Sequence, residues 1–198
     1  MLGFIRKTPP LPMPIITERL LIRPPALTDL NALNAGILES FPALHQFMDW
    51  AKKPPTLKES ENYLKSCLKN WIYKKNKEPY LPLFVFEIST QEFIGVAGFH
   101  HYDWKKGTIE TGYWIRTSKS NQGFMREAIA AHTDYAFNTL NIKKITITCD
   151  PDNVRSRNIP EKLGYTLETV LLNDRRKPDT GKPANTFVFT KEAHQKHA

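Results

Sequence analysis

The hydrophobic residues of this 198-residue chain are spaced in two ways, one typical of strands and the other typical of helices. A first apolar run, 15–23, is typical of a strand. Beyond it, apolar side chains recur every three or four residues, which predicts helices. Because proline costs a helix one hydrogen bond, we expect a first helix to end before Pro42 and a second, short one to cover 43–50. A longer helix is predicted over 57–74.

From residue 80 on, shorter apolar runs separated by polar turns predict strands. Three of them, at 83–89, 93–100 and 108–116, follow one another closely, which is typical of an antiparallel meander. A long helix over 123–138 and a strand over 142–149 come next. A helix that connects two neighbouring strands of one sheet makes these strands parallel.

The last part of the chain adds a short helix over 153–163, closed by Gly164, and two strands at 165–171 and 186–190. The resulting order is β-α-α-β-β-β-α-β-α-β-β. It predicts an α/β fold with a mixed α+β sheet that is mostly antiparallel and contains one central parallel β-α-β crossover flanked by helices. The length fits a single domain over residues 1–198.

Composition narrows the class of protein. No apolar run approaches the roughly 18 residues of a membrane span, so no membrane partner is expected. Cys67 and Cys149 are the two cysteines, far apart in sequence, which argues against a disulfide framework and fits a cytoplasmic protein. The net charge of +8 favours anionic partners. The basic residues are dispersed, so nucleic acid is not expected as the direct substrate.

The turn that leads into the helix 123–138 is the chemically informative segment. Backbone N–H groups at a helix start have no partner within the helix, and the helix dipole is positive there. Gly123 has no Cβ, so phosphate oxygens can approach its backbone. The turn therefore predicts a diphosphate site, although many such turns only connect two elements.

Two motifs around this turn resemble a known family. The stretches GYWI at 112–115 and SNQGFMREA at 120–128 resemble the cofactor motif of the GNAT acetyltransferase superfamily. The stretches DPDNVRS at 150–156 and EKLGY at 161–165 are similar to the motif that follows it. Their spacing resembles the RimJ/RimL branch, which acetylates the N-termini of ribosomal proteins. The resemblance covers about 93–172.

This resemblance implies the GNAT acyl-CoA N-acyltransferase fold, acetyl-CoA as the cosubstrate and no metal. It also implies that a backbone N–H within 114–116, on a splayed or bulged strand, stabilises the oxyanion. By their positions in the motifs, the residues expected to bind the cosubstrate are Trp114, Ile115, Arg116, Gln122, Gly123, Phe124, Met125, Arg126, Glu127, Asn153 and Ser156.

Three positions depart from the superfamily pattern. Ser120 and Met125 stand at the first and last places of a motif usually written Gln/Arg-x-x-Gly-x-Gly/Ala. Backbone donors tolerate both, but Met125 leaves less room beside the diphosphate. Many relatives carry a tyrosine general acid where this chain has Pro160. Proline has no proton to give, so another group must take that role.

Glu110 is the candidate general base. It lies in the middle of a predicted strand and shares a face with Thr108, Gly112 and Trp114. A carboxylate on such a face either borders a wet cleft or needs a partner, so a salt-bridged surface glutamate is the alternative. An acceptor amine must lose a proton to attack a thioester, and a carboxylate can accept it directly or through water.

Ser156 is the candidate proton donor to the departing thiolate, because the resemblance places a serine of related proteins at this position. It follows Asn153 by one helical turn, so both project from the same side of a helix start. Asn153 matches the residue that bonds the pantetheine arm. Both residues have a structural alternative, since asparagine and serine also cap or solvate helix starts.

The expected acceptor is the N-terminal α-amino group of a protein, such as a ribosomal protein. The alternatives are a small amine such as a polyamine or an aminoglycoside, and a non-catalytic acyl-CoA-binding module. The predicted helices between 28 and 77 carry more lysine than carboxylate, which disfavours a cationic small acceptor. His100 and His101 are adjacent in a strand and point to opposite faces, so no metal site is expected. The chain can be a monomer or a homodimer.

Overall fold

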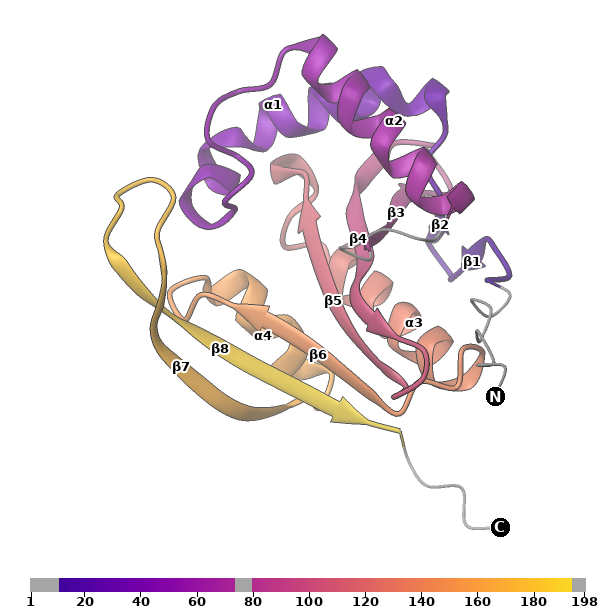
Figure 1. Cartoon of the computed structure of the whole chain (residues 1–198). Helices are drawn as coiled ribbons and strands as arrows, with labels where there is room; N and C mark the ends of the chain where they lie inside the picture. The colour runs from indigo at the N-terminus through magenta and orange to yellow at the C-terminus, as the bar shows by residue number, and fades with distance from the viewer. Residues whose placement is uncertain (1–10, 74–79, 194–198) are drawn as a thin grey trace, which may run out of the picture.

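The computed structural model describes residues 11–73 and 80–193 as one mixed sheet with helices on both faces (Figure 1). In chain order the elements are β1 Ile15–Ile16, β2 Leu20–Arg23, α1 Leu30–Phe47, α2 Leu57–Tyr73, β3 Tyr80–Glu87, β4 Phe93–Asp103, β5 Thr108–Ile115, α3 Phe124–Asn138, β6 Lys144–Cys149, α4 Val154–Lys162, β7 Thr166–Arg176 and β8 Pro183–Glu192. Short 3-10 turns at Leu27–Asp29 and Thr117–Lys119 precede α1 and α3.

The eight strands lie in the order β1-β2-β3-β4-β5-β6-β8-β7. Strands β3, β4 and β5 form the predicted antiparallel meander, and β5 and β6 form the predicted parallel pair. The expected fold class is therefore confirmed.

Helices α1 and α2 cover one face of the sheet, and α3 covers the other (Figure 1). The alternation of side chains along β3 serves both layers: Phe84 and Phe86 pack with α1 and α2, whereas Leu83 and Val85 join the core beneath α3. Because both faces are covered, β3 is apolar nearly throughout and the alternation between buried and exposed residues is lost.

The parallel pair is short, and this creates the site. β5 pairs with β6 at three positions only, from Thr108 opposite Lys144 to Glu110 opposite Thr146. Beyond Glu110 the two strands separate, as Figure 1 shows, while β5 stays paired with β4 up to Ile115. The sheet therefore opens into a fork at Glu110.

Two predicted elements were wrong. The run 15–23 is a hairpin of β1 and β2, because Thr17 turns the chain: its hydroxyl accepts from the Leu20 amide at 2.9 Å. Pro42 does not end the first helix but lies inside α1. Pro42 and Leu38, whose carbonyl loses its partner, are both exposed, so water can satisfy that carbonyl.

Other boundaries moved by a few residues. The helix predicted over 57–74 is α2, with residue 74 outside the described part of the chain. The last two strands are longer than predicted, and the turn between them is shorter. A register shift between Leu171 and Arg175, with Asn173 at φ 52°, lets pairing resume beyond the irregularity. Gly164 follows α4 at φ 71° and closes it as predicted.

Candidate active site

A cleft of about 630 Å³ begins at the fork between β5 and β6. One wall comes from α1, α2 and the loop between them, the floor from β3, β4 and β5, and the far wall from the end of β6 and the start of α4. Glu110 and Ser156, the two predicted catalytic residues, both line it, as do Trp114 and Asn153. These four predicted residues, which are up to 46 positions apart in the sequence, are thus brought to one cavity.

Glu110 stands where the strands part. Its Oε1 accepts a hydrogen bond from the hydroxyl of Thr148 on β6 at 2.9 Å, and its side chain is 28% exposed. Within the described residues, the basic group within 4 Å of it is the exposed imidazole of His101, at 3.9 Å from Oε2. A carboxylate that is open to the cleft and holds a single hydroxyl donor can accept a further proton.

Ser156 lies across the cleft on α4 and is paired with a tyrosine. The Tyr113 hydroxyl donates to the Ser156 carbonyl at 2.9 Å, and Ser156 Oγ donates back to the tyrosine oxygen at 3.3 Å. Burial raises the pKa of Tyr113, so its hydroxyl stays protonated. Asn153 caps α4 through its side-chain oxygen, which accepts from the Ser156 amide at 3.2 Å.

The backbone of β5 offers amides to the fork. The Arg116 amide donates to Ile94 on β4 at 2.9 Å. In an antiparallel pair, alternate residues direct their N–H to the same neighbour, so the Ile115 amide points away from β4 and towards the diverged side. The strand is splayed from β6 here but not bulged against β4, where the register shift lies between His100 and Asp103.

The start of α3 has the geometry of an anion site. Gly123 is the N-cap in a left-handed conformation, with φ 82° and ψ −5°, and Glu127 makes the first helical bond back to it at 3.0 Å. The amides of Phe124, Met125 and Arg126 therefore precede the hydrogen-bonded ladder. A Cβ on Gly123 would lie 3.4 Å from a guanidinium nitrogen of Arg19.

Arg19 is a further candidate site residue, which sequence reasoning missed. Its Nε bonds Glu127 Oε2 at 2.6 Å, another nitrogen donates to the Gln122 carbonyl at 3.1 Å, and its guanidinium lies 4.5 Å from the Phe124 ring centroid. Glu127 also accepts from the Thr17 hydroxyl at 2.5 Å, so its carboxylate anchors the β1–β2 hairpin. Arg19, although paired with Glu127, and Arg126 place guanidinium nitrogens beside the free amides, which fits a diphosphate.

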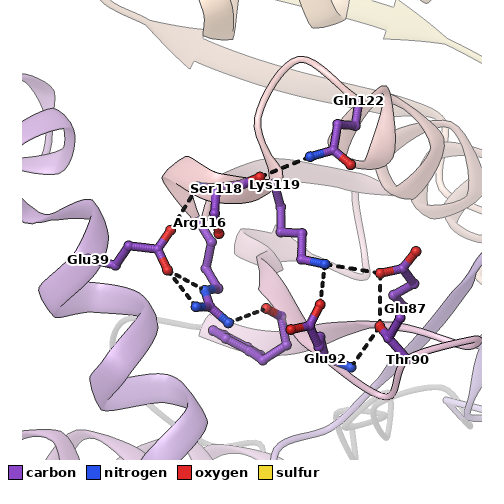
Figure 2. A network of polar contacts seen from close by, with 9 residues as sticks. Glu39, Glu87, Thr90, Glu92, Arg116, Ser118, Lys119 and Gln122 are labelled. Atoms are coloured by element: carbon purple, nitrogen blue, oxygen red, sulfur yellow. Dashed lines mark hydrogen bonds and ion pairs between the residues drawn. The ribbon is translucent and has the colours of Figure 1, made fainter.

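The loop before α3 is held by ion pairs (Figure 2). Arg116 bonds the Glu39 carboxylate of α1 at 2.9 Å, and the Ser118 amide donates to the same carboxylate at 2.7 Å. Lys119 bridges Glu87 and Glu92 at the β3–β4 turn. The side-chain amide of Gln122 donates to the Ser118 carbonyl at 2.9 Å. The helix start is thus positioned from both sides.

Two histidines near the cleft are neutral. Burial lowers the pKa of His100 to about 4 and that of His132 to about 3, with a smaller effect from a neighbouring histidine in each case. His100 lies over Gly112, where a Cβ would be 2.7 Å from its Nε2. It faces Glu110 across β4 and β5 and lines the cleft, a placement that only cross-strand pairing reveals.

Cys149, metal ligation and membrane spanning are the remaining features that bear on function. Cys149 lines the cleft as a free thiol, and burial raises its pKa to about 11, so it is a weak nucleophile. Within 11–73 and 80–193, no three His, Cys, Asp or Glu side chains are arranged to hold a metal ion. None of the helices in the described ranges is long and apolar enough to cross a bilayer.

Curated relatives share part or most of the chain. The uncharacterized N-acetyltransferase p20 of Bacillus licheniformis is 32% identical over 101 residues, which are 51% of this chain and 56% of that protein. The ribosomal-protein-serine acetyltransferase of Escherichia coli (strain K12) is 24% identical over 156 residues, which are 79% of this chain and 84% of that protein.

Solved structures share the fold. RimL, a ribosomal L7/L12 alpha-N-protein acetyltransferase in complex with coenzyme A, superposes with a TM-score of 0.79 at 20% identity, over 91% of this chain and 97% of that one. The microcin C7 self-immunity acetyltransferase MccE, in complex with acetyl-CoA and AMP, gives 0.78 at 22% identity, over 89% and 93%.

A family profile described as the acetyltransferase (GNAT) domain matches residues 19–166, a range that contains the fork, the start of α3 and the cap of α4. The chain belongs to the GNAT family and is an acetyl-CoA-dependent acetyltransferase of that type.

Proposed function

We propose that this enzyme, as a single domain over residues 1–198, transfers the acetyl group of acetyl-CoA directly to the N-terminal α-amino group of a protein. The observation that supports this most is the fork at Glu110. Glu110 stands on β5, and the hydroxyls of Ser156 on α4 and of Tyr113, also on β5, form a pair that lines the same cleft. A thioester between them would meet a base on one side and proton donors on the other.

The coenzyme is bound at the start of α3 in this proposal. The amides of residues 123–126 face the diphosphate, and the guanidinium groups of Arg19 and Arg126 balance its charge. Trp114, Ile115 and Arg116 lead from this helix to the fork along β5. The Ile115 amide is the donor that best matches an oxyanion on the thioester carbonyl.

The chemistry needs one C–N bond to form and one C–S bond to break. The amine attacks the thioester carbonyl and loses a proton to Glu110, directly or through water. Collapse of the tetrahedral intermediate expels the thiolate, which takes a proton from the Ser156 and Tyr113 hydroxyl pair. A proton equivalent to the one removed from the amine restores this pair through solvent.

An α-amino group suits this site. Its pKa is near 8, against about 10.4 for a lysine side chain, so more of it is neutral at physiological pH. The relative in Escherichia coli and the structural neighbour RimL carry names of ribosomal-protein acetyltransferases, which supports a ribosomal acceptor. The cytoplasm is the proposed compartment, in keeping with two free, buried cysteines.

Glu110→Gln tests the proposal, because glutamine keeps the bond from Thr148 but cannot accept the amine's proton. We expect kcat to fall by roughly 10²–10⁴-fold while the acetyl-CoA KM stays within about twofold. Glu168→Gln is the matched control, since Glu168 is an exposed strand glutamate paired with Lys144. Near-full turnover of Glu110→Gln across pH 6–10 would remove Glu110 from the role of base.

Ser156→Ala completes the test, and we expect it to lower kcat more than it raises the acetyl-CoA KM. Thiol release with a panel of peptides and small amines, followed by mass analysis of the acetylated nitrogen, identifies the acceptor class. Acetylation of polyamines or aminoglycosides but of no peptide would contradict a protein acceptor. Coenzyme binding without turnover for any acceptor would indicate a non-catalytic module instead.

A further inference from the structure

Aromatic rings line the cleft on several sides. Six aromatic side chains line the cleft, and they come from the α1–α2 loop and its flanking helices, from β3 and from β5. They are Phe47, Trp50, Tyr63, Tyr80, Tyr113 and Trp114. The thioester chemistry described above uses Tyr113 alone among them, so the other rings need another explanation.

Trp50 is the exposed member of this group. Its side chain is 52% exposed, yet it lines the cleft and its ring centroid lies 6.3 Å from that of Trp114, which is only 8% exposed. A large apolar ring left half in water beside a cavity loses the benefit of burial until something covers it.

The loop that carries Trp50 is well anchored. Ala51 is 2% exposed, and its carbonyl lies 2.8 Å from Nδ1 of His45, whose ring stacks on Phe41. The Ala51 amide donates to Met48 at 2.9 Å. These contacts already order the loop. A ligand that covers the Trp50 ring therefore binds without the entropic cost of ordering the loop.

The floor opposite this loop is equally fixed. The rings of His100 and Tyr80 stack at 4.2 Å, and the Tyr80 hydroxyl lies 3.1 Å from that of Tyr63 on α2. Since burial keeps His100 neutral, it adds a flat, uncharged ring next to Glu110. The acceptor meets aromatic surface on the floor as well as on the wall.

The charge of the cleft is opposite to that of the chain. Four carboxylates line it against one lysine and one arginine, although the whole chain carries +8. Lys53 pairs with Glu59 and Arg175 with Asp150. Within the described residues, this leaves Asp49 and Glu110 without a lysine or arginine partner. The excess of lysine over carboxylate in the helices between 28 and 77 therefore does not set the charge of the cleft.

Resting on the proposed function, we propose that this cleft selects an N-terminal residue with an aromatic side chain. The protonated amine of a polypeptide beginning with Phe, Tyr or Trp is attracted by Asp49 and Glu110, and its ring covers Trp50. A Ser or Ala N-terminus carries the same amine but leaves the Trp50 ring in water, so the difference between the two acceptors lies in the ring contact.

Steady-state kinetics with peptides that differ only in their first residue test this proposal. We expect kcat/KM for Phe and Trp peptides to exceed that for Ser and Ala peptides by about tenfold or more. Trp50→Ala should bring the Phe peptide down to the level of the Ala peptide and leave the acetyl-CoA KM unchanged. Leu172→Ala is the control, because Leu172 is 72% exposed and lies outside the cleft.

Each other outcome has a distinct meaning. Equal or better turnover of Ser and Ala peptides overturns the aromatic preference and leaves the proposed function intact. A preference that survives in Trp50→Ala overturns the contact with Trp50 as its cause and also leaves the proposed function intact. Acetylation of phenethylamine but of no peptide contradicts a protein acceptor while supporting the ring contact. Turnover of none of these amines contradicts both the protein acceptor and the ring contact, provided that thermal melts show that the protein is folded.

Discussion

In the proposed complex, the start of α3 and the aromatic part of the cleft hold their ligands by different means. At α3 the contacts are backbone amides and two guanidinium groups, and the loop before the helix is fixed by ion pairs (Figure 2). At the other end the contacts are rings and carboxylates that come from separate segments of the chain, with Trp50 on a loop and His100 on β4.

This difference separates affinity for the coenzyme from choice of the acceptor. A diphosphate needs unpaired N–H groups and positive charge, which one helix start and two arginines supply whatever amine is acetylated. The acceptor end has no such fixed requirement, so its side chains decide which amine is accepted. Changes at one end should therefore leave the kinetic constants of the other end unchanged.

The largest effect on coenzyme binding is expected from Gly123→Val at the start of α3. A residue with a Cβ costs roughly 1–2 kcal/mol in the left-handed conformation, and valine here would also approach Arg19. We expect coenzyme A affinity, measured by calorimetry, to fall at least tenfold, with the acceptor KM unchanged.

Gly181→Val is the matched control for backbone strain. Gly181 also has a positive φ, 67°, but nothing lies within 4 Å of its Cβ position, and it belongs to the turn between β7 and β8. It should lose similar stability and keep its coenzyme affinity. An equal loss of affinity in both variants would show that Gly123 acts through stability alone.

A smaller effect is expected from Glu39→Gln, which weakens the loop of Figure 2. Burial alone would raise the pKa of Glu39, but the amide and hydroxyl of Ser118 and the guanidinium of Arg116 outweigh it and hold the pKa below its ordinary value of 4.5. Because an exposed ion pair contributes little, we expect about a threefold rise in the acetyl-CoA KM at pH 7.

The same variant gives a pH test. A carboxyl whose pKa is lowered by folding stabilises the protein above the unfolded pKa of 4.5, and this contribution is lost as the pH falls through the lower folded value. The difference in Tm between wild type and Glu39→Gln should therefore shrink below pH 4.5. Glu61→Gln, which breaks ion pairs on α2 only, should leave the acetyl-CoA KM unchanged.

The sequence predicted the secondary structure around the start of α3 well because this part of the fold is local. A glycine at a helix start, and the strand before it, are neighbours along the chain, so periodicity and turn chemistry suffice. The ionic partners of this loop are distant, since Glu39 lies on α1 and Arg19 precedes β2. The spacing of these residues along the sequence does not indicate that they are partners of the loop.

The acceptor end could not be predicted in the same way. His100 reaches Glu110 only through the register of β4 and β5, and Trp50 reaches Trp114 only when the α1–α2 loop folds over the sheet. Pro42 shows a further limit, because its cost depends on whether the freed carbonyl meets water, which is a property of the folded surface.

Backbone amide NMR during titration with coenzyme A tests the central claim, that unpaired amides at the start of α3 hold the diphosphate. We expect the largest shifts at residues 122–127, and we expect acetyl-pantetheine, which lacks the diphosphate, to leave these amides nearly unshifted. Shifts concentrated elsewhere, or the same shifts with acetyl-pantetheine, would contradict the account.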